Sequence, residues 1–211
     1  MQKLIFLLFL SWFCFSCGSS DIKNESSTTY YDENNKEISA QKFNKLLNQY
    51  KAFEIPAESS LERKLISRNQ QGKTDQRKNL DNLLEKTHQI SIDAEKPLII
   101  IYHPGADECN QGGIATAASK KKWFDEMEEK IQKFVKVKPI YLYKTTDGLQ
   151  DRDLVVDWLK DPNHEVENLF FKHHYPCSSY VIIDKNGNYR SYFGEFSKEE
   201  IIKDVKKIAK K

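Results

Sequence analysis

Of the four cysteines and five histidines of this chain, two cysteines and three histidines are candidates for a chemical site. Cys109 lies in the loop "HPGADECNQGG", directly after the apolar run "PLIIIY", and Cys177 follows a proline in "HHYPCSS". Thiolates attack disulfide bonds and also bind soft metal ions. Cys109 is therefore a candidate for half of a redox pair, for one end of a structural disulfide, or for a metal ligand.

A metal site would draw on His103, Cys109, Cys177 and the adjacent pair His173 and His174. Imidazole and thiolate ligands suit copper or zinc. The loop supplies a single cysteine, however, and a histidine at a strand end can bond backbone carbonyl groups instead. Neighbouring histidines also point to different faces of a chain. We therefore predict neither a metal nor another cofactor.

The N-terminal residues predict export. Lys3 precedes an apolar run from Leu4 to Phe15, and small and polar residues follow. This run is shorter than the roughly 20 residues that cross a bilayer as a helix. A positive charge, a short apolar run and then small residues are typical of a secretory signal.

The run ends at Ser16-Cys17-Gly18, which resembles the lipobox of bacterial lipoproteins. In that family a cysteine is lipidated and becomes the mature N-terminus, so the resemblance implies that Cys17 anchors the chain to a membrane of the cell envelope. Cys14 stands where lipoboxes usually carry an aliphatic residue. The alternative is cleavage after Ser16 or Ser19 and release as a secreted or periplasmic soluble protein.

Export changes how the remaining cysteines are interpreted. If the signal and the lipid account for Cys14 and Cys17, the folded part contains only Cys109 and Cys177. Two cysteines outside the cytoplasm are readily oxidised to a disulfide.

Composition and length favour one globular domain with additional elements. The 211 residues include 33 Lys and Arg against 31 Asp and Glu, and these charges are interspersed. Because no concentrated basic face or motif accompanies them, nucleic acid is not an expected partner. We predict a signal sequence at 1–16, a flexible tether at 17–29, an extension at 30–77 and the main domain at 78–211.

Hydrophobic spacing predicts an α/β fold with a mixed central sheet and helices on both faces. One β-α-β crossover predicts parallel strands, and Asn-Gly between two β-rich runs predicts an antiparallel hairpin. In chain order we expect a helix after Ser39, a strand at 51–56, a helix at 76–90, a strand at 98–102, a helix at 116–135, a strand at 139–144, short helices at 152–159 and 165–171, strands at 179–184 and 189–194, and a helix capped by Ser197.

This order of elements resembles the thioredoxin-like fold superfamily. The similarity runs from about Leu80 to the C-terminus and rests also on the loop after "PLIIIYHP" and on "HHYPCSSYVIIDKNGNYRSYFG". In that family a cis-proline precedes the strand that leads into the final hairpin, beside the active-site loop. Pro176 stands at that place, so the resemblance implies a thioredoxin-like domain with a cis Tyr175–Pro176 bond.

The Cys-x-x-Cys motif of thioredoxin-like oxidoreductases is missing. The stretch "ADEC" lies where that motif would be, with Ala106 in the place of the attacking cysteine and Cys109 in that of the resolving one. Gly112 and Gly113 disfavour a helix directly after Cys109, so we expect the helix to begin near Thr116. Ordinary thioredoxin activity is not expected.

Peroxiredoxins are a second resemblance to consider. They place a threonine three residues before the peroxidatic cysteine, and here Ala106 precedes Cys109 by three. Pro104 is also too close to Cys109 for that motif. Peroxidase activity is therefore not expected.

The thioredoxin-like resemblance also implies that Cys177, next to Pro176, lies against the loop of Cys109. The two cysteines would then form either a structural disulfide or a redox-active pair. We predict a membrane-anchored lipoprotein whose domain is a non-catalytic module that binds or supports an envelope protein. The alternative is an extracytoplasmic thiol–disulfide oxidoreductase that uses Cys109 and Cys177.

Overall fold

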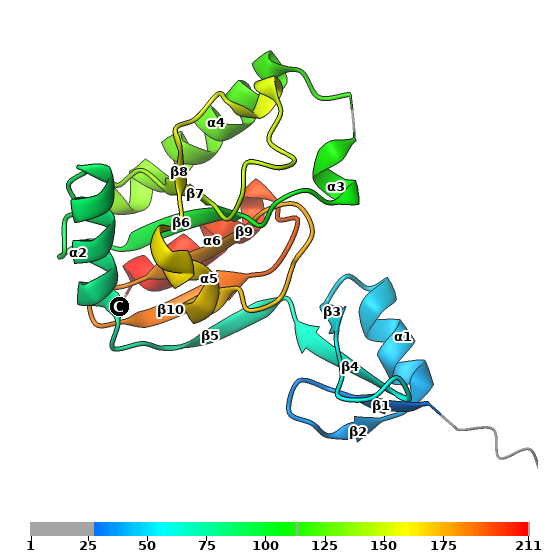
Figure 1. The fold of residues 1–211 in the computed structure, drawn as a ribbon. Coiled ribbons are helices and arrows are strands. Elements are labelled where there is room, and N and C mark those ends of the chain that lie inside the picture. Colours follow the sequence, from blue (N-terminus) through cyan, green and yellow to red (C-terminus); the bar gives the residue numbers. More distant parts are fainter. Residues whose placement is uncertain (1–27, 113, 211) are drawn as a thin grey trace, which may run out of the picture.

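The computed structural model of the chain describes residues 28–112 and 114–210. These residues form two mixed β-sheets and their covering helices (Figure 1). The predicted signal sequence, Cys17 and nearly all of the tether lie outside the described residues. None of the helices in the described part combines the length and the apolar character needed to cross a bilayer.

The smaller sheet and one helix come from the N-terminal extension. Its strand order is β2-β1-β4-β3, with β1 parallel to β4 and the other pairs antiparallel. The helix α1 contributes Phe43, which is fully buried against the sheet. The elements are β1 (Thr29–Tyr31), β2 (Glu37–Ile38), α1 (Ala40–Asn48), β3 (Ala52–Ile55) and β4 (Glu62–Ser67).

The larger sheet has six strands in the order β5-β10-β9-β6-β7-β8. The strands β6, β7 and β8 are parallel, whereas β9, β10 and β5 are each antiparallel to their neighbours. This confirms the predicted mixed sheet. The strands are β5 (Asn69–Lys73), β6 (Leu98–His103), β7 (Ile140–Tyr143), β8 (Trp158–Lys160), β9 (Ser179–Ile183) and β10 (Asn188–Tyr192).

Helices cover both faces of the larger sheet (Figure 1). Along β6 the side chains alternate, so that Ile99 and Ile101 pack on one face and Ile100 and Tyr102 on the other. A strand buried on both faces has no polar side, which explains its continuous apolar run. The first face is covered by α4 (Ala117–Val135) and α6 (Lys198–Ala209), and the second by α2 (Arg77–His88) and α5 (Glu165–Phe170).

Capping side chains mark where α1, α4 and α6 begin, and those of Ser39 and Ser197 were predicted. The side chains of Ser39, Thr116 and Ser197 each accept a hydrogen bond from the backbone N–H three residues later. A separate helical turn, α3 (Glu108–Gln111), precedes α4 and ends at Gly112. The predicted start of the long helix near Thr116 is therefore confirmed, whereas the helical turn that contains Cys109 was not predicted.

The helix predicted at 152–159 is wrong. That segment forms a 3₁₀ turn, η1 (Asp151–Asp153), and then the edge strand β8. Trp158 packs its ring against Tyr141 of the neighbouring strand, and its indole N–H donates to the carbonyl of Asp153. Tertiary pairing with β7 has overridden the local pattern.

The extension also contributes an edge strand to the larger sheet. Strand β5 pairs with β10, and Arg68 lies between the last strand of the small sheet and this edge strand. The division between the two sheets therefore falls at Arg68, earlier in the chain than the predicted boundary between 77 and 78. A second 3₁₀ turn, η2 (Pro162–His164), precedes α5.

Candidate functional site

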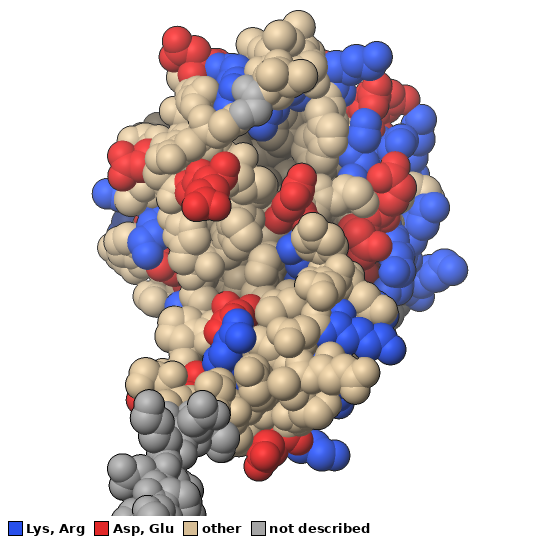
Figure 2. Space-filling view, turned by 90° about the vertical axis from the view of Figure 1, so that its right-hand side faces the viewer, with Lys and Arg blue, Asp and Glu red and all other residues tan. Residues whose placement is uncertain are grey.

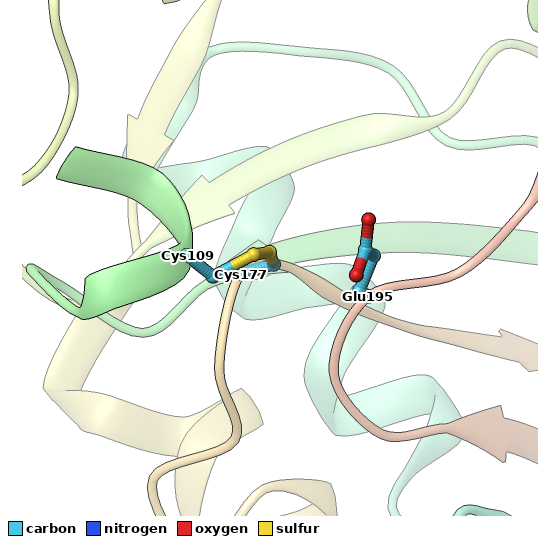
Figure 3. A group of neighbouring side chains, drawn as sticks. All are labelled: Cys109, Cys177 and Glu195. Carbon is cyan, nitrogen blue, oxygen red and sulfur yellow. A yellow bond between two sulfur atoms is a disulfide. The ribbon is translucent and has the colours of Figure 1, made fainter. Parts of the chain in front are cut away.

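Cys109 and Cys177 form a disulfide between two segments that are 68 residues apart in the chain (Figure 3). Their Cα atoms are 5.2 Å apart, within the usual range for a disulfide. Cys109 belongs to α3 and is exposed, whereas Cys177, in the segment between α5 and β9, is half-buried. The pairing implied by the thioredoxin-like resemblance is thus present, and solvent reaches it from the Cys109 side.

Asp107 connects the two cysteine-bearing segments. One carboxylate oxygen accepts the N–H of Asn110 at 2.9 Å and so caps α3. The other oxygen accepts the N–H of Cys177, also at 2.9 Å. The His174 ring lies 3.5 Å from this second oxygen. The Asp107 carboxylate therefore holds the backbone on both sides of the disulfide.

The loop after β7 packs against the loop that contains Cys109. Gly148 has φ +83°, and a Cβ there would lie 2.5 Å from the amide oxygen of Asn110 and 2.9 Å from the Cα of Ala106. The side-chain amide of Gln150 donates to the carbonyl of Gln111 at 3.0 Å. A glycine is needed at 148 because the two loops approach so closely.

His103 holds the same supporting loop in place. Its Nε2 lies 2.8 Å from the carbonyl oxygen of Asp147, so this nitrogen carries a proton and donates. Burial lowers the pKa of His103, although the hydrogen bond to Asp147 opposes that shift. His103 is therefore a neutral, buried residue that positions the loop after β7.

The cis bond expected before Pro176 is wrong, because every peptide bond among the described residues is trans. The chain changes direction there by another means. Cys177 has φ +65°, in the left-handed region that residues other than glycine rarely adopt. A residue held in this region beside a reactive group is typical of functional sites.

A largely apolar groove of about 410 Å³ opens beside Cys177. Its floor and walls come from β6, α4 and the loop after β10, and Lys120 and Glu195 stand at its polar rim. The side of the molecule that carries α3 is seen in Figure 2, where uncharged side chains cover much of the middle of the view. The apolar lining residues are Ile101, Ala115, Trp123, Phe124 and Phe196.

Glu195 is the functional candidate that sequence reasoning missed. One ligand atom each from Cys109, Cys177 and Glu195 lies within 4.8 Å of the other two (Figure 3). In the described part of the chain this trio is the one group whose side chains meet as metal ligands could. No motif marks Glu195, which lies in "GEFS", 18 residues beyond Cys177.

The histidines do not join this trio. His103 is bonded to Asp147, and His174 lies beside Asp107. His173 packs edge-on to Tyr175, and burial lowers the pKa of His173. The candidate metal site considered from the sequence, which combined histidines with both cysteines, is therefore not formed among the described residues.

The N-terminal extension positions the Glu195 loop. Arg68 donates from its guanidinium to the carbonyl of Glu195 at 3.1 Å, and its own carbonyl accepts the N–H of Phe193 at 2.9 Å. Gly194, at φ +74°, donates its N–H to the hydroxyl of Ser179 at 2.9 Å. A Cβ at Gly194 would lie 2.5 Å from the ring of Phe53. The backbone is thus held at Phe193, at Gly194 and at Glu195 itself.

Comparisons with known proteins identify no relative. No model of a protein family matches the chain, and no curated protein matches it either. Because a fold alone does not define an activity, the exposed disulfide, its groove and Glu195 are the basis for a functional proposal.

Proposed function

We propose that this chain is an exported, lipid-anchored protein whose thioredoxin-like domain exchanges disulfides through Cys109 and Cys177. The observation that carries the proposal is the disulfide itself, whose Cys109 side is exposed and whose Cys177 side borders an apolar groove. Disulfides that serve only stability resist reduction, whereas exposed ones are the labile, regulatory or catalytic class.

The thioredoxin-like assignment is supported by the order of elements. A buried strand (β6), a long helix (α4), a parallel strand (β7), a hairpin (β9 and β10) and a closing helix (α6) follow one another in the expected sequence. The loop after β6 meets the segment before β9, as that resemblance implies. The trans bond before Pro176 is a departure from the family pattern.

Exchange begins with a thiolate of the partner, because both cysteines of the site are held in the disulfide and Ala106 supplies no further thiol. The partner thiolate attacks the sulfur of Cys109, the more exposed of the two residues, the Cys109–Cys177 bond breaks, and Cys177 leaves as a thiolate. A partner–Cys109 mixed disulfide has then formed.

A second thiolate of the partner attacks the partner's sulfur in the mixed disulfide and releases Cys109 as a thiolate. The partner dithiol has lost two electrons and two protons, and Cys109 and Cys177 have gained them as thiols. The reverse sequence reduces a partner disulfide. The apolar groove would hold side chains next to the reacting cysteine of a polypeptide partner.

The order of attack gives a direct test. In the full chain with Cys14→Ala and Cys17→Ala, Cys177→Ser leaves Cys109 as the only thiol, and it should form a mixed disulfide with oxidised glutathione that mass spectrometry detects. Cys109→Ser leaves the half-buried Cys177, which should react several-fold more slowly. Equal rates for the two variants, or no reaction of Cys109, would contradict the proposed mechanism.

A non-catalytic envelope module is the second candidate, and Ala106 favours it. Without an attacking cysteine, the domain lacks the feature that starts reduction in thioredoxin-like enzymes. In that case the Cys109–Cys177 bond would fix the two loops as a binding surface for an envelope protein. A bond that resists physiological thiols would favour this candidate.

A further inference from the structure

We propose that the reduced protein binds a zinc ion through Cys109, Cys177 and Glu195. The site uses the two cysteines of the proposed function in their dithiol form, so zinc and thiol exchange would compete for the same sulfurs. Zinc binding and mixed-disulfide formation have separate readouts, and either can fail alone.

The three side chains fit a zinc site once the disulfide is broken and the two sulfur atoms move slightly apart. Tetrahedral zinc with Zn–S bonds of about 2.3 Å places two sulfurs roughly 3.8 Å apart. The ligand atoms of Cys109, Cys177 and Glu195 already lie within 4.8 Å of one another, so breaking the disulfide brings them into the required range.

The ligand chemistry favours zinc over other ions. Two thiolates with one carboxylate combine soft and hard donors, a mixture that zinc accepts, whereas Cu(I) prefers sulfur alone. Three protein ligands leave one position for water or for a partner's side chain. That open position would face solvent, since Cys109 and Glu195 are both exposed.

The Glu195 carboxylate is available as a ligand. Within the described ranges, no hydrogen bond or ion pair involves the side-chain oxygens of Glu195. The hydrogen bond from Arg68 goes to the backbone carbonyl of Glu195 instead. Lys120, which also lines the groove, pairs with Asp153 at 3.0 Å. The carboxylate therefore stands beside the sulfurs without a competing partner (Figure 3).

Zinc binding requires that the disulfide first be reduced. A phosphine reductant takes up the oxygen of water to become a phosphine oxide, and the two sulfurs receive the two electrons and two protons. Zinc then replaces the two thiol protons, which are released to solvent. The oxidised protein should consequently bind no zinc at this site.

The experiment uses the full chain with Cys14→Ala and Cys17→Ala, so that Cys109 and Cys177 are its only cysteines. After phosphine reduction and removal of excess reductant under argon, zinc chloride is titrated against a chromophoric chelator. One zinc per reduced chain and none per oxidised chain is expected. A reduced chain that binds no zinc would overturn the proposal, and the mixed-disulfide test above would still stand or fall separately.

Glu195→Gln is the critical variant, and Glu108→Gln is its matched control next to Cys109. Loss of an outer-sphere partner usually weakens metal binding by roughly 10–100-fold, so loss of a direct ligand should cost at least about tenfold. Glu108→Gln should leave the affinity unchanged. Equal affinities for Glu195→Gln and the parent, or equal weakening by both variants, would contradict ligation by Glu195. Cobalt substitution provides a second readout, because thiolate-to-cobalt charge-transfer bands should appear only in the reduced chain.

Discussion

The carboxylate of Asp107 accepts a hydrogen bond from the backbone N–H of Cys177, 70 residues further along the chain, at 2.9 Å. The same side chain caps the helical turn that contains Cys109. Asp107 thus sets the separation of the two sulfur-bearing segments independently of the bond between them. The dithiol form should consequently keep its two sulfurs close.

Asp107→Ala should destabilise the fold and make the disulfide easier to reduce. Removing the carboxylate leaves a half-buried N–H and a helix cap unsatisfied, which costs about 1–3 kcal/mol. Chemical denaturation of the oxidised protein measures this loss. Glu108→Ala, which removes a neighbouring exposed carboxylate, is the control and should change stability little. Identical unfolding of Asp107→Ala and the parent would contradict the bridging role.

His103 should make stability depend on pH below neutrality. Burial lowers its pKa in the folded protein, so between that value and the usual 6.5 the unfolded chain binds more protons than the folded one. The contribution of His103 to the free energy of unfolding is fully present above pH 6.5 and is lost as the pH falls through the pKa of His103 in the folded protein. The slope reaches at most about 1.4 kcal/mol per pH unit for one proton.

Denaturation midpoints of the parent and of His103→Gln between pH 7.5 and pH 5 test this prediction. Glutamine retains an N–H donor for Asp147 and does not titrate, so the variant should lose less stability on acidification. A variant of His103 with the parent's pH dependence would show that another group is responsible.

Trp123→Ala should impair exchange with peptides more than exchange with glutathione. Trp123 lines the groove beside Cys177, and a polypeptide partner would lay an apolar side chain there, whereas glutathione has none. We expect a several-fold slower reaction with a cysteine peptide flanked by leucine. Phe134→Ala, on the same helix but outside the groove, is the control. Equal effects on both substrates would argue against a role for the groove in binding.

Cys17→Ala should abolish membrane anchoring. A lipidated N-terminal cysteine carries more than one acyl chain, which is enough for stable attachment, and alanine cannot be lipidated. Detergent-phase partitioning of cell fractions measures the effect. Cys14→Ala should leave partitioning intact, because that residue lies within the predicted signal sequence. Unchanged partitioning of Cys17→Ala would refute lipidation at this residue.

The central elements of the fold could be predicted because their burial is periodic in the sequence. The continuous apolar run of β6 reflects burial on both faces of the sheet, and the helical spacing in α4 and α6 reflects the single face by which each helix packs on it. Strand β5, "NQQGK", has no such pattern, because it is a polar edge strand held mainly by backbone pairing with β10. Strand β8 was also missed, since three residues with one anchoring tryptophan do not define a period.

The site was predicted only in part, for a related reason. The thioredoxin-like resemblance brought Cys109 and Cys177 together, and the structure contains that pair. Glu195 could not be found from local sequence, since its position depends on Arg68 of the extension and on the loop geometry at Gly194. The trans Pro176 was likewise unpredictable, because the turn is made at the following residue instead.

The equilibrium redox potential of the Cys109–Cys177 bond tests the central claim most directly. The full chain with Cys14→Ala and Cys17→Ala would be equilibrated in glutathione and dithiothreitol buffers, and the two thiols counted by alkylation and mass spectrometry. A thiol-exchange protein should titrate between about −120 and −270 mV, where dedicated thiol catalysts lie. A potential below about −300 mV, as for structural disulfides, would contradict the proposed exchange activity.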